Sequence, residues 1–264
     1  MRSNDRGIIV DKMMSLEKVW QERFSKQAIK GKTDHQKMWY ASSSQQQEHL
    51  KLVLWIIRKS GLKRRATLLE AGCGTGFYIK ELLKLKEVDS IVGLDMSLTM
   101  LRTTAKESRI AECKLIQSMI SSLPLAECII DGVVCMSVLQ TVEDHKKAIM
   151  ELCRVLKPGG FLIASTLRQY SIWELACVLP WLFMADSPGG RKEKTIYNLI
   201  KSRKTLIWDE LPEGYPPKMY KYSELRNILK DNGMQDIKCY YPGRIRYLPF
   251  LWNSFNMIFF ARKA

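Results

Sequence analysis

Residues 68–77 read Leu-Leu-Glu-Ala-Gly-Cys-Gly-Thr-Gly-Phe, an apolar run that leads into a glycine-rich turn and then into a helix-like segment. Such a turn brings backbone N–H groups close to a ligand, and side chains at positions 72, 74 and 76 would obstruct that approach. A Gly-x-Gly pair alone is weak evidence, but its place between a buried strand and an amphipathic helix strengthens it. The stretch predicts a nucleotide site at the end of this strand.

Two acids indicate the kind of ligand. The spacing Glu-x-Gly-x-Gly-x-Gly differs from the Gly-x-Gly-x-x-Gly of dinucleotide folds, and Glu70 at the strand end would repel a pyrophosphate. The same acid suits a cationic ligand with an amino group. Asp95 ends the next apolar run, about twenty residues later, where an acid can accept both ribose hydroxyls. Asp95 could instead cap the following helix, although Ser97 could equally supply that cap.

From residue 66 onward, short apolar runs alternate with amphipathic segments. Strands that are apolar throughout, each followed by a helix, predict an α/β fold with a parallel sheet covered on both faces. The expected strands are Thr67–Glu70, Ile91–Asp95, Lys114–Ser118, Ile129–Met136, Phe161–Thr166, Gln235–Tyr241 and Phe255–Arg262. The expected helices of this part are Phe77–Lys86, Leu98–Ser108, Glu143–Leu156 and Ser223–Lys230. Lys157–Gly160 is expected to stop a helix and turn into the fifth strand.

Helical patterns precede this core, and a long interruption divides it. Leu16–Lys30 and Gln45–Ser60 are expected to be helices, the second with apolar residues at i, i+3, i+4 and i+7. After Thr166 the alternation stops for about fifty residues rich in aromatic side chains, which is typical of a lid or binding element. We therefore divide the chain into an N-terminal helical cover (1–62), a cofactor-binding core (63–166), an insertion that forms an acceptor lid (167–221), and a C-terminal helix with two strands (222–264).

Four motifs in order resemble the class I S-adenosylmethionine-dependent methyltransferases, in particular those of small-molecule and quinone-biosynthesis type. They are the loop at 70–76, Gly93–Asp95, Ile130–Val134 and Leu152–Phe161, the last similar to the family's Arg-Val-Leu-Lys-Pro-Gly-Gly segment. The resemblance covers roughly Ala66–Thr166, with a weaker echo in Tyr222–Ile237. It implies a Rossmann-like fold with a seven-stranded, mostly parallel sheet, helices on both faces, and S-adenosyl-L-methionine as cofactor.

The resemblance also implies which residues contact the cofactor. The residues expected in this site are Glu70, Gly72, Cys73, Gly74, Gly76, Asp95, Met96, Cys135 and Met136. The glycines would pack against the methionine and ribose portions, while Cys135 and Met136 would line the methionine side. Glu70 would reach the amino group, Asp95 would hold the ribose hydroxyls, and Met96 would pack on the adenine.

The chain departs from the family pattern after the third strand, where an acid often contacts the adenine amine. Met119 occupies that position. Backbone groups of Met119 and Ile120, or the Ser118 hydroxyl, would serve instead.

Methyl transfer from a sulfonium is an in-line displacement that depends mostly on proximity and orientation. A general base is needed only if the acceptor is protonated at the attacking atom. The candidate catalytic residues are Tyr40 and His35 in the N-terminal cover, and Gln140 beyond the fourth strand. His49 is expected to be an exposed helix residue, and His145 a surface residue at a helix start.

The net charge of +15 is uneven: residues 1–65 carry +9, residues 66–165 carry −1, and residues 166–264 carry +7. Basic flanks suit an acidic small molecule, a nucleic acid or a lipid surface, or they only keep the surface solvated. We expect methyl transfer to a small-molecule acceptor that is hydrophobic or aromatic, with an anionic group and with oxygen as the accepting atom. An RNA (tRNA) methyltransferase and a non-catalytic cofactor-binding scaffold stay open as alternatives.

The seven cysteines include no Cys-x-x-Cys pair, which argues against a disulfide framework and against a zinc site, and no metal is expected. No stretch approaches the eighteen or so apolar residues of a membrane span, and residues 1–11 are polar. These features predict a cytoplasmic protein. Peripheral membrane contact and the oligomeric state stay open.

Overall fold

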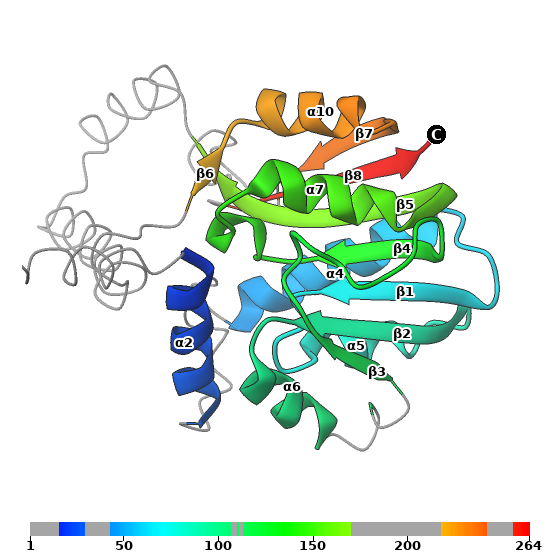
Figure 1. The fold of residues 1–264 in the computed structure, drawn as a ribbon. Coiled ribbons are helices and arrows are strands. Elements are labelled where there is room, and N and C mark those ends of the chain that lie inside the picture. The colour runs from blue at the N-terminus through cyan, green and yellow to red at the C-terminus, as the bar shows by residue number, and fades with distance from the viewer. Residues whose placement is uncertain (1–15, 30–42, 107–109, 111–112, 170–217, 242–255) are drawn as a thin grey trace, which may run out of the picture.

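A computed structural model describes residues 16–29, 43–106, 110, 113–169, 218–241 and 256–264. These residues form a single sheet between two layers of helices (Figure 1). The strand order is β3-β2-β1-β4-β5-β8-β7, with a short additional strand, β6, paired with β5. The expected Rossmann-like α/β fold is confirmed, and seven strands lie along the main path of the sheet.

The sequence pattern places most elements within a few residues of their observed bounds. The strands are β1 (Ala66–Ala71), β2 (Val88–Asp95), β3 (Lys114–Gln117), β4 (Ile130–Cys135), β5 (Leu156–Arg168), β6 (Met219–Tyr220), β7 (Met234–Tyr240) and β8 (Asn256–Lys263). The helices are α2 (Leu16–Ile29), α4 (Ser43–Lys59), α5 (Phe77–Leu82), α6 (Leu98–Ala105), the 3-10 helix η2 (Leu139–Thr141), α7 (His145–Arg154) and α10 (Tyr222–Asp231).

The direction of strand addition reverses at β1. The chain adds β2 and β3 on one side of β1 and then β4 and β5 on the other, all of them parallel. The loops that follow β1 and β4 therefore diverge at the carboxyl edge of the sheet, which is where ligands bind in open α/β sheets. Beyond β5 the pairing becomes antiparallel, with β8 between β5 and β7.

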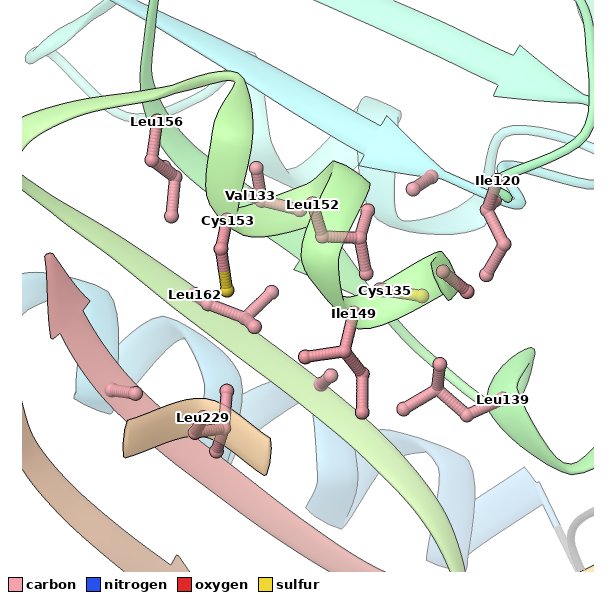
Figure 2. Close-up of a cluster of buried hydrophobic side chains, with 14 of the residues drawn as sticks. Ile120, Val133, Cys135, Leu139, Ile149, Leu152, Cys153, Leu156, Leu162 and Leu229 are labelled. Atoms are coloured by element: carbon pink, nitrogen blue, oxygen red, sulfur yellow. The ribbon is translucent and has the colours of Figure 1, made fainter. Parts of the chain in front are cut away.

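Each face of the sheet has its own apolar core. On one face, α7 and α10 cover alternate strand residues, and Figure 2 shows Ile149, Leu152 and Cys153 of α7 beside Val133 and Leu162. On the other face, α4 and α5 pack on the intervening residues of the same strands. Because side chains alternate along a strand, this double coverage explains why the strands are apolar throughout.

Two expectations about element bounds are wrong. The first helix after the glycine loop was expected to reach Lys86, but it ends at Leu82 with a cap at Leu83. Lys157–Gly160 does not lie ahead of the fifth strand but within β5, where the register with β4 shifts between Ile130 and Gly132. The Lys157 ammonium donates to the Asp131 carboxylate at 2.8 Å, which fixes this irregular segment to β4.

The register of β4 and β5 depends on a close approach. Gly132 pairs with Phe161, and a Cβ at Gly132 would lie 2.3 Å from the Phe161 ring. Phe161 is fully buried. Only glycine leaves room for this ring.

Candidate functional site

A cavity of about 340 Å³ opens at the carboxyl edge of the sheet, where the strand order reverses. Its walls come from the segments after β1, β2, β3 and β4, and from helices α2, α4, α5 and α6. Of the residues expected to contact the cofactor, the cavity wall includes Glu70, Gly72, Cys73, Asp95, Met96, Ser118, Met119, Ile120 and Met136.

Asp95 organises the loop at the edge of the cavity. One carboxylate oxygen accepts a hydrogen bond from the Gly74 N–H at 2.9 Å, and the other accepts from the Ser97 N–H at 2.8 Å. The Ser97 side chain, not Asp95, caps α6, because it accepts from the Met100 N–H. Each carboxylate oxygen has a second lone pair, so Asp95 can still accept hydrogen bonds from a ligand.

The glycine loop is tied to the end of β2. The N–H groups of Gly72 and Cys73 both donate to the Leu94 carbonyl, at 2.7 and 2.9 Å. Gly72 has φ +80°, and a Cβ there would lie 2.2 Å from a methyl group of Val138. The absence of a side chain at Gly72 therefore lets the loop after β4 close against the loop after β1.

The structure places Gly74 and Gly76 away from the cavity wall, on the side of α6. The Thr104 hydroxyl of α6 donates to the Gly74 carbonyl at 2.7 Å. A Cβ at Gly76 would lie 2.8 Å from Thr104 and 2.7 Å from Ile110. These two glycines allow close packing of the loop against α6, and we find no contact between them and the cavity.

Glu70 is 3% exposed and lines the cavity, and within the described part of the chain its Oε2 has no hydrogen-bond partner. Burial raises the pKa of this carboxyl well above its usual range, and the neighbouring Asp95 raises it further. Burial likewise raises the pKa of Asp95, although backbone N–H groups partly oppose the shift. A positive charge between two carboxyls that face one small cavity would stabilise the ionised form of both.

Neither cysteine proposed for the site is reactive. Cys73 lines the cavity, but burial strongly raises the pKa of its thiol. Burial raises the pKa of Cys135 to about 12, and its side chain lies in the core beneath α7 (Figure 2). Cys135 is therefore a core residue and does not line the cavity, and neither thiol is a nucleophile near neutral pH.

The wall near β3 is built from thioethers and backbone. It includes Met96, Met100, Met119 and Ile120, with the Met119 side chain 46% exposed. The Ser118 hydroxyl donates to the Ser122 carbonyl at 2.8 Å, so its proton is already engaged. Among the cavity-lining residues that the structure describes, the carboxyls are those of Glu70 and Asp95, and none comes from this side.

The segment after β4 contributes Met136, Ser137 and Val138 to the wall. Ser137 has φ +59°, and its N–H donates to the Ser165 hydroxyl at 2.8 Å. The Ser137 hydroxyl is buried and has no hydrogen-bond partner in the ranges that the structure describes. Gln140 is fully buried and lies off the cavity wall, with its backbone carbonyl bound to the Lys218 N–H at 2.9 Å.

Helix α2 docks on the segment that follows β2. The Gln21 amide donates to the Met96 carbonyl at 2.7 Å, and the Ser25 and Ser97 hydroxyls lie 2.9 Å apart. Phe24 of the same helix lines the cavity. Nothing in the sequence of α2 indicated these contacts, because its pattern is only weakly amphipathic.

Helix α4 also reaches the cavity, through Gln46 in its first turn. The expectation that His49 is exposed is wrong: its side chain is fully buried, and burial lowers its pKa to about 4. His145 begins α7 as expected but is only partly exposed, because it lies against Tyr220 and 3.2 Å from Glu224. Gln46 is a site residue that the sequence analysis missed.

Two of the candidate catalytic residues, His35 and Tyr40, lie outside the described residues, as does most of the insertion at 167–221. Among the residues that the structure does describe, no helix has the length and apolar character needed to cross a membrane.

Comparison with known proteins agrees with this geometry. Residues 69–164 match the model of the methyltransferase domain family. The chain is 32% identical over 113 residues to an uncharacterized methyltransferase of Bacillus subtilis (strain 168), covering 43% of this chain and 62% of that protein. It is 39% identical over 108 residues to a malonyl-[acyl-carrier protein] O-methyltransferase of Buchnera aphidicola, covering 41% and 42%. The matched part therefore spans less than two thirds of the length of these relatives.

The fold also matches a solved structure. The crystal structure of magnesium protoporphyrin IX methyltransferase from Synechocystis PCC 6803 with bound SAM superposes with a TM-score of 0.59 at 16% identity, covering 95% of this chain and 98% of the other. At that identity the likeness concerns the fold alone. In sequence, residues 69–164 match a methyltransferase domain, and in fold the chain resembles a methyltransferase that was solved with bound SAM.

Proposed function

We propose that this protein binds S-adenosylmethionine in the cavity and transfers its methyl group to a small-molecule acceptor. The observation that carries the proposal is the pair of buried carboxyls, Glu70 and Asp95, at the ends of adjacent parallel strands. A ligand with a sulfonium, an ammonium and a ribose diol supplies both positive charge and hydrogen-bond donors to them.

Within the cavity, the residues present fit the parts of this cofactor. The ribose hydroxyls would donate to the free lone pairs of Asp95, and the adenine would lie among the thioethers of Met96, Met100 and Met119. Its amine would meet backbone groups near Met119 and Ile120, because no carboxyl lines this side among the described residues. S-Adenosylmethionine supplies an electrophilic methyl group when it is bound.

The chemistry requires alignment more than acid–base catalysis. The hydrogen bonds of Asp95 to the Gly74 and Ser97 N–H groups hold the loop that would position the ligand. Tyr40, His35 and Gln140 stay our candidates for contacting the acceptor. The accepting atom is proposed to be oxygen, which the named activity of the Buchnera relative supports. A hydrophobic acceptor with an anionic group fits the aromatic side chains and basic residues of the 167–221 insertion.

The proposal is tested by incubating the purified protein with methyl-labelled S-adenosylmethionine and a cell extract, and then separating RNA from solvent-extractable molecules. Label in the extractable fraction is the expected result, and mass analysis would identify the product. Label in RNA would replace the small-molecule acceptor with a nucleic acid. Binding without transfer to either fraction would indicate a cofactor-binding scaffold.

Cofactor affinity should rise with pH because of Glu70. In the free protein the raised pKa keeps this carboxyl protonated up to a higher pH than an ordinary glutamate, and a bound ammonium lowers that pKa. Binding therefore releases a proton between the two pKa values, and affinity increases as pH rises toward the pKa of the free protein. The stability of the ligand-free protein depends on pH in the opposite direction. Its free energy of unfolding falls as pH rises through the raised pKa of Glu70, because the folded state holds this proton more tightly than the unfolded state.

Calorimetric titration with S-adenosylhomocysteine from about pH 5 to about pH 8, in buffers of different ionisation enthalpy, measures both affinity and proton release. Glu70→Gln should abolish most of the pH dependence. If the variant keeps the wild-type slope, the proton comes from another group.

A further inference from the structure

Gln46 is a buried polar side chain on the cavity wall to which the proposed function gives no role. Gln46 lies in the first turn of α4, is 4% exposed and lines the cavity, yet its Oε1 has no hydrogen-bond partner among the residues that the structure describes. Buried amide oxygens are nearly always paired, so an orphaned one on a cavity wall indicates that a ligand supplies the donor.

Gln46 faces the cavity from the same side of the sheet as Glu70. Leu50 and Val53 of α4 share one core cluster with Leu68 of β1. Glu70 lies two residues beyond Leu68, so its side chain leaves the strand on this face. The second orphaned atom of the cavity wall on this face is Glu70 Oε2.

Both unpartnered atoms are hydrogen-bond acceptors. Oε1 of Gln46 is an amide oxygen, and Oε2 of Glu70 is a carboxylate oxygen when Glu70 is ionised. A carboxylate or phosphate brought between them would be repelled. A primary ammonium offers three N–H donors and a positive charge, and it can donate to both oxygens at once.

We propose that Gln46 binds the α-ammonium of the ligand's amino-acid portion through Oε1, in concert with Glu70. This inference rests on the proposed function. Gln46 thereby makes the site discriminate between an adenosyl thioether that carries an amine and one that does not. The opposite orientation of the amide would direct Nε2 to the ligand's carboxylate, and the two arrangements differ in which part of the ligand they recognise.

Three ligands separate these arrangements in calorimetric titrations. S-Adenosylhomocysteine carries both the amine and the carboxylate, its decarboxylated analogue carries only the amine, and 5′-methylthioadenosine carries neither. Gln46→Leu removes the amide at nearly constant volume. It should lower the affinity of the two amine-bearing ligands about tenfold to a hundredfold, and that of methylthioadenosine less than about twofold.

Two further variants sharpen the comparison. Gln47→Leu makes the same change at an exposed position of the same turn and should leave all three affinities unchanged. Gln46→Glu keeps an acceptor oxygen and should retain binding of both amine-bearing ligands.

Several outcomes would overturn the inference. These are an equal loss for all three ligands in Gln46→Leu, no loss for any, or a loss confined to the ligand with the carboxylate. Unchanged methylthioadenosine binding in Gln46→Leu shows that the cavity is intact, so a folding defect is recognised separately. If the wild-type protein binds none of the three ligands, the proposed function itself fails, and this inference fails with it.

Discussion

Asp95→Ala is expected to weaken the binding of S-adenosylhomocysteine by at least about a hundredfold. In the proposed function Asp95 accepts two charge-assisted hydrogen bonds from the ribose, and the loss of each costs about 1.5–3 kcal/mol. The Gly74 and Ser97 N–H groups also lose their shared acceptor, Asp95. The glycine loop and the start of α6 are then no longer held together by this carboxylate. The ligand site and the loop that builds it depend on the same carboxylate.

Titration calorimetry measures this loss directly. Asp89→Ala is the matched control, because Asp89 lies on the same strand but is exposed at its opposite end, and it should bind as the wild type does. Asp95→Asn keeps the shape but turns an N–H group toward one of the two backbone donors, so it should bind poorly as well. An unchanged affinity in Asp95→Ala would remove the ribose assignment.

Gly132→Ala is expected to lower the free energy of unfolding by about 3 kcal/mol, the upper end of the usual cost of overpacking. The new methyl group would lie 2.3 Å from the Phe161 ring, which has no free space to enter because it is buried in the core beneath α4. Urea unfolding measures the change.

A double-mutant cycle identifies the cause. Phe161→Leu removes the part of the ring that the new methyl would meet, so adding Gly132→Ala to it should cost much less than in the wild type. Gly159→Ala is the comparison for backbone strain alone: Gly159 has φ +76° and open space around it, so its cost should be only about 1 kcal/mol. Additive effects of the two core substitutions would show that the ring contact is not the cause.

The alternation of buried strands and amphipathic helices was sufficient to predict the parallel part of the sheet. A run of consecutive apolar residues indicates a strand that is buried on both faces, and β1, β2 and β4 each contain such a run. The sequence could not show that Lys157–Gly160 lies within β5, because a Lys-Pro-Gly-Gly segment has turn propensity and its pairing with β4 depends on distant contacts such as Asp131.

The sequence predicted the site residues that lie at the ends of strands. It did not predict those on helices that pack against the sheet from elsewhere in the chain. Glu70 and Asp95 each end an apolar run, which places them at the same edge of the sheet. Gln46 and His49 lie on a helix whose buried side is set by tertiary packing in the core cluster that includes Leu68 of β1. The sequence analysis therefore expected His49 to face water and made no prediction for Gln46. The packing of Gly76 against Thr104 and Ile110 could not be predicted, because a glycine in the sequence does not reveal whether ligand or protein fills the space beside it.

The position of β8 has a consequence for biosynthesis. Chain elongation delivers β1 to β5 first, and β8 is the last of the described strands to leave the ribosome, although it lies between β5 and β7. Until then the part of β5 that pairs with β8, Phe161–Leu167, presents an open edge to its surroundings. Proteolytic loss of β8 would expose the same edge, so the described core would become prone to aggregation although the cavity lies at a different edge of the sheet.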